Sequence, residues 1–303
     1  MRVVEIKLMI PIMEPHFEIA SSPTPRNDNH LRRIDRLCSA MPQIRVNYDL
    51  IAHLFDKGPY RAKSVDPELL AFIDARRAAD PPSVLDIGCG TGSQLVANHS
   101  IVPHGRLVGL DRSLGMLRQA QRKSRHIAWV QGDGAMLPFQ NKSFDFVTCQ
   151  HALHHVRDKA GMLGSVFRVL RPGGRLMILT LCPQESADWL YYEYFPDAYA
   201  IDLTDFWPPQ SVTTALQAAS FAPVTAEHRH LHYEQNMQEW LKVVRRRDVT
   251  SQLMVISDAA YATGLRRLEE GLAVGSTPPL RADHICLVTI RADRPLEAGV
   301  STR

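Results

Sequence analysis

The feature that most constrains the fold is the alternation of short apolar runs with helical patterns between residues 83 and 181. Each run has the length and composition of a buried strand. The segment 158–170 between two of them repeats apolar residues at helical spacing, and "RPGG" (171–174) ends it. The predicted strands are "SVLDI" (83–87), "RLVGLD" (106–111), "IAWVQ" (127–131), "FDFVTCQ" (144–150) and "RLMILTL" (175–181). Such alternation predicts a parallel sheet covered by helices on both faces.

A glycine-rich turn, "GCGTG" (88–92), follows the first of these strands. Ligands of doubly wound sheets bind at the carboxyl ends of the strands, so this loop is the expected ligand site. Glycine permits a tight turn and a close approach of the backbone to a ligand. A phosphate-binding P-loop would require a lysine, which "GCGTGSQL" lacks, and Ser93 stands where a dinucleotide turn would carry its third glycine. Neither phosphate-binding pattern is therefore present.

Three aspartates stand at, or just after, the carboxyl ends of three successive predicted strands. Asp86 lies two residues ahead of the glycines, where it would repel a phosphate and attract a cation. Asp111 can accept hydrogen bonds from ribose hydroxyls, and Asp133 can accept one from an adenine amino group. Each acid alone is better explained as a loop or capping residue. Together they indicate S-adenosylmethionine, which carries an ammonium and a sulfonium but no phosphate.

The motifs "VLDIGCGTG", "LVGLDRSLGML", "GDGAMLPFQNKSFDFVTCQHALHHV" and "VLRPGGRLMIL" occur in this order over residues 84–180. In these motifs the chain resembles the class I S-adenosylmethionine-dependent methyltransferases. The resemblance is nearest to the branch that holds quinone-pathway and biotin-pathway small-molecule enzymes. It implies an α/β fold with a doubly wound, Rossmann-like, mostly parallel seven-stranded sheet whose last strand is reversed. An N-terminal and a mid-chain helical lid are expected to accompany the sheet.

The resemblance also implies a set of cofactor-binding residues. Asp86 and the glycines are expected to line the methionine moiety, Asp111 to hold the ribose, and Asp133 with Ala135 to flank the adenine. Arg112 departs from the family, which often has an apolar residue here; its guanidinium either stacks on the base or points to solvent. The expected set comprises Asp86, Gly88, Cys89, Gly90, Gly92, Asp111, Arg112, Met116, Gly132, Asp133, Gly134, Ala135 and Gln150, and in the N-terminal lid Tyr60 and Arg61.

Candidate bases for methyl transfer lie in "CQHALHHV" (149–156), just after the fourth predicted strand. An in-line displacement at the methyl carbon sometimes needs a proton removed from the acceptor, and histidine suits that role near neutral pH. His151 and His154 are the two candidates. The alternative is that they have no part in the chemistry, because the resembled family often carries histidine here without a base role.

No metal site is predicted from the sequence. The five cysteines form no CxxC pair and are interpreted as reduced thiols. "HRHLH" places His228, His230 and His232 on one face of a predicted strand, but no cysteine stands near them in the sequence. The run "RRR" (245–247) is interpreted as a solvated helix face, with contact to RNA or to an acidic carrier as the alternative.

Residues 189–207 contain four of the eight tyrosines and two of the four tryptophans. Such a segment either lines a pocket for an apolar or aromatic acceptor or packs as a cap, and both roles are compatible. The expected acceptor contacts are Tyr48, Tyr191, Tyr194 and Trp207. The predicted division is a partly disordered extension (1–40), a methyltransferase domain (41–293) with lid segments at 45–65 and 183–209, and a tail (294–303).

Charge and hydropathy limit the possible partners. The net charge is only +3, which gives no reason to expect nucleic acid, and no segment approaches the ~20 apolar residues that span a bilayer. A cytoplasmic enzyme acting on a small molecule is therefore predicted, with the acceptor atom and the oligomeric state open. Two alternatives are a tRNA wobble-uridine-type methyltransferase, to which "LPFQNKSFDFVTCQHALHHV" is also similar, and a non-catalytic cofactor-binding protein.

Overall fold

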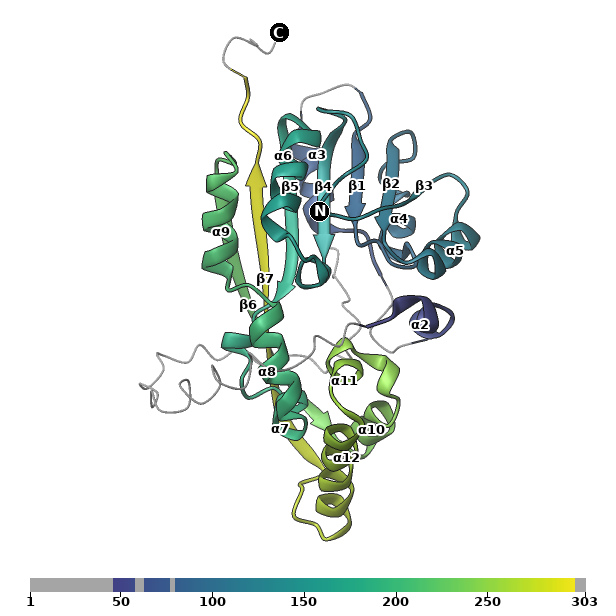
Figure 1. The fold of residues 1–303 in the computed structure, drawn as a ribbon, viewed down its shortest axis with the longest axis vertical. Coiled ribbons are helices and arrows are strands. Elements are labelled where there is room, and N and C mark those ends of the chain that lie inside the picture. Colours follow the sequence, from purple (N-terminus) through teal and green to yellow (C-terminus); the bar gives the residue numbers. More distant parts are fainter. Residues whose placement is uncertain (1–45, 58–62, 77–79, 298–303) are drawn as a thin grey trace, which may run out of the picture.

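The computed structural model describes residues 46–57, 63–76 and 80–297 (Figure 1). Seven strands form one sheet in the order β3-β2-β1-β4-β5-β7-β6. Neighbours from β3 to β5 are parallel, whereas β7 is antiparallel to both β5 and β6. The strands are β1 Ser83–Ile87, β2 Arg106–Asp111, β3 Ala128–Gln131, β4 Phe144–Gln150, β5 Leu170–Leu181, β6 Val224–Asn236 and β7 Leu280–Asp293. The predicted fold class, with its reversed last strand, is confirmed.

Helices cover both faces of the sheet because side chains alternate along each strand. In β1, Val84 belongs to a core with α3, α4 and α5, while Leu85 belongs to the opposite core with α6 and α9. Both residues are fully buried. The helices around the sheet are α2 Tyr48–Phe55, α3 Pro67–Ala75, α4 Ser93–Asn98, α5 Leu114–Lys123, α6 Lys159–Val169 and α9 Pro209–Ala218, with the 3₁₀ turn η1 Leu153–His155.

A helical cap forms a third core below the sheet as drawn in Figure 1. The cap consists of two stretches of chain, one after β5 and one between β6 and β7. The long strands β6 and β7 extend from the sheet into the cap. Its elements are η2 Pro183–Glu185, α7 Leu190–Tyr194, α8 Pro196–Asp205, α10 Met237–Val244, η3 Arg247–Val249, α11 Ser251–Val255 and α12 Asp258–Ala273. The mid-chain lid predicted at 183–209 is thus part of a larger cap.

Local sequence explains where many of these helices begin. A capping side chain accepts a hydrogen bond from a backbone N–H of the first turn, which satisfies a group that the helix itself leaves unpaired. Such caps precede α2, α3, α5, α6, α10, α11 and α12, and they are Asn47, Asp66, Ser113, Asp158, Asn236, Thr250 and Ser257.

Two expectations about element boundaries differ from the structure. The sequence pattern also predicts a helical stretch near 235–271. The structure divides it into α10, η3, α11 and α12, and the Arg247 side chain in η3 donates a hydrogen bond to the Leu253 carbonyl. Strand β5 begins at Leu170 rather than 175, because Leu170 already pairs with Phe144, and the pairing resumes at Arg175 after a shift of register. In the described part of the chain, no helix is both long enough and apolar enough to cross a membrane.

Candidate functional site at the carboxyl edge of the sheet

The turn between β1 and α4 depends on glycine. Gly88, Gly90 and Gly92 all have φ between +54° and +73°, a left-handed conformation that residues with a side chain rarely adopt. A Cβ on Gly88 would lie 2.4 Å from the Ala152 Cβ, and one on Gly92 would lie 2.3 Å from the Trp129 ring. These two glycines therefore allow the turn to pack against neighbouring elements.

Gly90 has a different role, because space remains above it. A Cβ built there would meet one described atom within 4 Å, Cε1 of Phe55 in α2, at 3.8 Å. The Gly90 N–H donates to Asp111 Oδ2 at 2.8 Å, and the Ser113 N–H donates to Asp111 Oδ1 at 2.8 Å. Asp111 thus ties the glycine turn to the end of β2. Each of its oxygens keeps a lone pair that can accept a ligand hydroxyl.

Asp86 is the most electrostatically unusual group at this edge. Asp86 lies near the end of β1, and the residue is only 4% exposed. Burial raises the pKa of its carboxyl from 3.8 to about 8, partly offset by the Lys63 ammonium, and the carboxylates of Asp66 and Asp111 raise it further. A bound cation would offset the cost of ionising it, which suits an ammonium or sulfonium and disfavours phosphate.

The third acid shapes a loop after β3. Asp133 is exposed, and its Oδ1 accepts a hydrogen bond from the Ala135 N–H at 2.9 Å. The Gly132 N–H donates to the Asp111 carbonyl at 3.0 Å, so the loops after β2 and β3 adjoin. Met116 is buried beneath them, and Arg112 is exposed. The expected adenine-side residues therefore lie on adjoining loops, while the two alternatives for Arg112 stay open.

Helix α2 is fastened to these loops by two aspartates that the sequence analysis did not single out. Asp49 Oδ1 accepts hydrogen bonds from Ser113 Oγ at 2.8 Å and from the Gly115 N–H at 2.6 Å. Asp56 accepts one from Thr91 Oγ1 at 2.6 Å and forms an ion pair with Lys123. We call this pair, Asp49 and Asp56, the lid latch. Tyr60 and Arg61, expected to contact the cofactor, lie outside the described residues.

The segment after β4 positions three histidines differently. His151 is exposed and has φ +52°, a strained conformation for a non-glycine residue, with its N–H bonded to the Leu179 carbonyl. His154 is 9% exposed, and its ring stacks on Phe206 at 3.9 Å. Burial holds the pKa of His154 well below its usual value, and neither ring nitrogen has a hydrogen-bond partner among the described residues. His154 is therefore neutral and enclosed.

Two further contacts join this segment to the rest of the site. His155 Nε2 lies 2.8 Å from the Tyr48 hydroxyl of α2, so α2 also contacts the end of β4. Gln150 Nε2 donates to Asp66 Oδ2 at 2.8 Å. His155 thus has a role in holding α2 that the sequence did not indicate.

The expected acceptor residues do not share one location. Tyr48 lies beside His155, whereas Tyr191 and Tyr194 are almost fully buried in the cap core, where both contact Trp240. Trp207 packs on the sheet core below the Lys159 ammonium. A hollow of about 610 Å³ lies between α2 and the cap, lined in part by Ile51, Met254 and Ile256. None of the predicted site residues lines it, so the acceptor assignments remain predictions.

A doubly wound sheet with a glycine turn after β1 and acids after three strands defines a Rossmann-like nucleoside-binding protein. Residues 85–178 match the family model described as a methyltransferase domain. A demethylmenaquinone methyltransferase from Roseiflexus castenholzii is 32% identical over 199 residues, covering 62% of this chain and 79% of the relative. The chain belongs to the class I S-adenosylmethionine-dependent methyltransferases, and it is similar to their quinone-pathway members.

Other relatives match over a shorter part of their length. The chain spans 34% of an uncharacterised 37.1 kDa transposon protein from Streptomyces fradiae and 48% of a demethylmenaquinone methyltransferase from Lactococcus lactis. The latter is 39% identical over 122 residues, which is 37% of this chain. Among solved structures, a proposed methyltransferase from an antibiotic biosynthesis pathway of Anabaena variabilis has a TM-score of 0.59 at 20% identity. It covers 73% of this chain and 95% of its own, and it supports the fold alone.

Proposed function

We propose that this chain binds S-adenosylmethionine at the carboxyl edge of β1, β2 and β3 and transfers its methyl group to a small apolar or aromatic molecule. The observation that carries the proposal is the buried Asp86 beside the glycine turn. A carboxylate with a pKa raised to about 8 by burial is costly in the free protein, and a cationic ligand would offset that cost. The family assignment supports the same cofactor.

The residues at this edge fit the cofactor group by group. Asp86 would hold the ammonium and face the sulfonium, while the Asp111 oxygens, already fixed by Gly90 and Ser113, would accept from the ribose hydroxyls. Asp133 and Ala135 would flank the adenine. The space above Gly90 would accommodate part of the ligand without displacing backbone. When bound, S-adenosylmethionine supplies an electrophilic methyl group on a positively charged sulfur.

The chain's own residues then have distinct tasks. The lid latch would keep α2 over the glycine turn and exclude water from it. His151 is exposed at the end of β4 in a strained conformation, which makes it the preferred candidate to accept a proton from an acceptor hydroxyl or acidic carbon. His154 is neutral but enclosed, so it would act only if Phe206 moved.

The acceptor class is inferred from the cap and from the relatives. The cap core is rich in aromatic side chains next to the sheet edge, and relatives are named for demethylmenaquinone methylation. A quinone-like or natural-product-like aromatic is therefore the preferred acceptor, with oxygen, nitrogen and carbon as open acceptor atoms.

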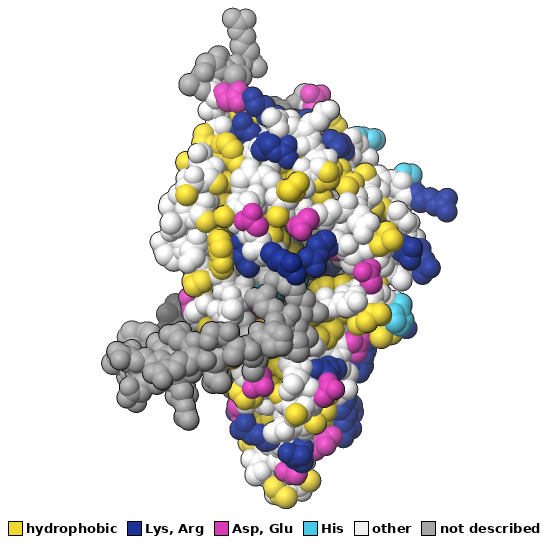
Figure 2. Space-filling view, viewed as in Figure 1, with side chains coloured by type: hydrophobic (Ala, Val, Ile, Leu, Met, Phe, Trp, Pro, Cys, Tyr) yellow, Lys and Arg dark blue, Asp and Glu magenta, His cyan; other side chains and the backbone are white. Residues whose placement is uncertain are grey.

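A nucleic-acid substrate is not favoured by the surface. Each arginine of the run at 245–247 is paired with a carboxylate, and the partners are Glu269, Asp248 and Asp258. On the face shown in Figure 2, Lys and Arg are interspersed with Asp and Glu rather than joined in one basic surface. We place the enzyme in the cytoplasm, in keeping with four buried cysteines in the described residues that form no disulfide.

The test is a search for the labelled product. The purified chain is incubated with methyl-labelled S-adenosylmethionine and an extract of its host, and small molecules, RNA and protein are then separated. Label in organic-soluble small molecules is expected, and it should be lost with Asp86→Ala but kept with Asp74→Asn, an exposed position on α3. Label in RNA would favour the wobble-uridine alternative. Cofactor binding without any labelled product would favour a non-catalytic role.

A further inference from the structure

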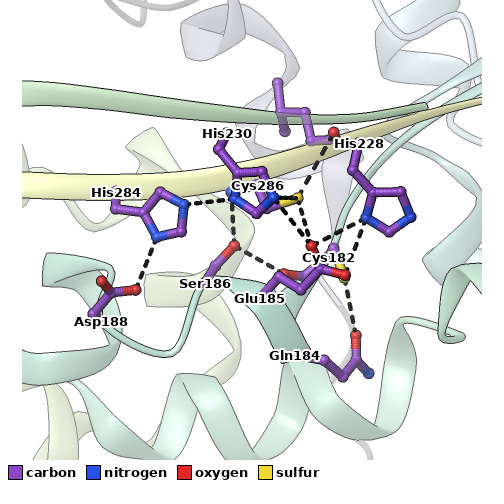
Figure 3. A network of polar contacts seen from close by, with 10 residues as sticks. Cys182, Gln184, Glu185, Ser186, Asp188, His228, His230, His284 and Cys286 are labelled. Carbon is purple, nitrogen blue, oxygen red and sulfur yellow. Dashed lines mark hydrogen bonds and ion pairs between the residues drawn. The ribbon is translucent and has the colours of Figure 1, made fainter. Parts of the chain in front are cut away.

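A second polar cluster lies where β5, β7 and β6 run side by side (Figure 3). Strand pairing aligns its members, because His230 of β6 stands directly opposite Cys286 of β7, and the Cys182 N–H, just after β5, donates to the Cys286 carbonyl. Residues paired across neighbouring strands project from the same face of a sheet. The structure therefore supplies what "HRHLH" lacked in the sequence, namely cysteines beside its histidines.

Glu185, in the turn η2, completes the cluster. Its carboxylate lies 3.0 Å from His228 Nδ1, 3.3 Å from His230 Nε2 and 3.5 Å from Cys286 Sγ. Two groups of donor atoms have all members within 4.8 Å of one another, and they share Glu185. The groups are Cys182, Glu185 and His228, and Glu185, His230 and Cys286.

Two of the three donor separations in the second group match those expected around a tetrahedral ion. Zn–S bonds of about 2.3 Å and Zn–N or Zn–O bonds of about 2.0–2.1 Å at a tetrahedral angle place neighbouring donor atoms roughly 3.3 to 3.6 Å apart. The observed separations are 3.3 Å between His230 and Glu185, 3.5 Å between Glu185 and Cys286, and 4.0 Å between Cys286 and His230. For these three donors, a small movement of Cys286 or His230 would suffice, whereas Cys182 belongs to the other group and would have to turn toward them.

The outer contacts orient the donors toward the common centre. His230 Nδ1 lies 3.0 Å from His284 Nε2, and His284 Nδ1 lies 2.9 Å from Asp188 Oδ1, so Nε2 of His230 is the nitrogen that faces Glu185. Ser186 Oγ donates to the Cys182 carbonyl and accepts from the Cys286 N–H, which holds the two cysteines together. Imidazole-to-carboxylate relays of this kind typically support histidine ligands of metals.

We propose that Glu185, His230, Cys286 and Cys182 bind one zinc-type divalent cation, with His228 as the alternative fourth ligand. Two thiols, an imidazole and a carboxylate are ligands that Zn²⁺ prefers, and the mixed sulfur set disfavours Mg²⁺ and Ca²⁺. Cys182 and Cys286 are almost fully buried, whereas the side chains of Glu185 and His230 are 39% and 44% exposed. The ion would therefore be reached from solvent and held against the core.

The site would fasten the cap to the sheet. Glu185 belongs to η2, which leads from the end of β5 into α7 and α8, while His230 and Cys286 belong to the long strands that carry the other half of the cap. One ion would thus link both chain segments that enter the cap. The role is structural, and the site lies away from the glycine turn after β1, so metal binding and cofactor binding are separable.

The experiment measures metal directly, using the full chain without a polyhistidine tag. The purified protein is reduced, freed of metal with a chelator, and titrated with Zn²⁺ and with Co²⁺. We expect one ion per chain, a thiolate-to-cobalt charge-transfer absorption, and a rise in Tm on adding Zn²⁺. The affinity for S-adenosylhomocysteine is measured in parallel. A chain that does not bind this ligand would contradict the proposed function but would leave the proposed metal site untouched.

Variants assign the ligands. Glu185→Gln with His230→Asn should abolish stoichiometric Zn²⁺ binding, and Cys182→Ser with Cys286→Ser should abolish the charge-transfer band. His284→Asn should weaken binding roughly 10- to 100-fold. His126→Asn, an exposed histidine outside the cluster, is the matched control and should bind as wild type. Circular dichroism of the metal-free variants identifies any that fail to fold. If the ligand variants fail to fold, the Zn²⁺ affinity of His284→Asn decides whether the site is as proposed.

Three results would overturn the proposal. The first is a reduced wild-type chain that takes up no stoichiometric Zn²⁺. The second is Zn²⁺ binding that survives in the folded Glu185→Gln, His230→Asn variant. The third is a purified chain in which Cys182 and Cys286 form a disulfide, and in which the reduced thiols give no thiolate-to-cobalt charge-transfer absorption when Co²⁺ is added.

Discussion

Replacing Asp86 with asparagine should stabilise the free protein and weaken its cofactor binding at the same time. Asp86 is buried, and burial raises the pKa of its carboxyl from 3.8 to about 8. At neutral pH the folded chain therefore holds a proton that the unfolded chain has released. The resulting cost in stability is absent below about pH 4, grows as the pH rises, and is complete above about pH 8.

The size of the effect follows from the pKa difference. One pKa unit corresponds to about 1.36 kcal/mol, so at pH 7 Asp86 costs at most about 4 kcal/mol of unfolding free energy. Asparagine removes the titration but leaves a buried amide, whose desolvation costs about 1 to 3 kcal/mol. The variant should therefore be more stable by about 1 to 3 kcal/mol at pH 7, and Tm should rise by a few degrees in a chain of this size.

Cofactor binding should change in the opposite direction. Losing a hydrogen bond to a charged partner costs about 1.5 to 3 kcal/mol, so S-adenosylmethionine should bind roughly 10- to 150-fold more weakly to the variant. Wild-type affinity should rise about tenfold between pH 6 and pH 7, because Asp86 has to lose its proton before it can pair with the ligand cation. The asparagine variant should lack this dependence.

Thermal unfolding at pH 4, 7 and 8.5, together with calorimetric titration at pH 6 and 7, provides the assay. Asp74→Asn, at an exposed position, controls for the loss of one negative charge. A lower Tm for Asp86→Asn at pH 7, together with unchanged cofactor affinity, would contradict this prediction. Such a result would mean that Asp86 is ionised and satisfied within the free protein.

Three further predictions test the surroundings of the site. Gly88→Ala would place a Cβ 2.4 Å from that of Ala152 at φ +72°, and chemical denaturation should show a loss of roughly 2 to 5 kcal/mol; a neutral result would contradict the packing described. Asp49→Ala removes two hydrogen bonds from the lid latch, so stopped-flow measurements should show cofactor dissociation that is about fivefold faster. An unchanged dissociation rate would count against a lid role for α2. Asp145→Ala leaves Arg76 and Arg171 without their buried partner and should cost about 3 to 5 kcal/mol while sparing cofactor affinity, which calorimetry can check.

Much of the fold could be predicted because its signals are local. The strand-length apolar runs predict β1 to β5, and the spacing of Leu163, Val166 and Leu170 predicts α6. The cofactor edge is predictable for the same reason, since Asp86 and Asp111 lie at the ends of β1 and β2, and Asp133 follows β3. Parallel packing then brings the three acids to one edge.

The rest depends on contacts that no local pattern encodes. Asp49 and Asp56 are unremarkable acids until α2 packs on α5, and His155 gains its role only beside Tyr48. The thiols of Cys182 and Cys286 meet His230 only through the pairing of β5, β7 and β6. Such sites are set by strand register and by tertiary packing, which is why the absence of nearby cysteines in the sequence was a poor guide at "HRHLH".

Calorimetric titration of S-adenosylmethionine into the wild-type chain and into Asp111→Asn, with NAD as the competing ligand class, measures cofactor binding and selectivity. The cofactor assignment predicts one binding site for S-adenosylmethionine, no detectable binding of NAD, and at least tenfold weaker binding by a variant that is otherwise folded. Equal binding by the two proteins, or a preference for NAD, would contradict it, because Asp111 is the group that fixes the glycine turn and is placed to accept the ribose hydroxyls.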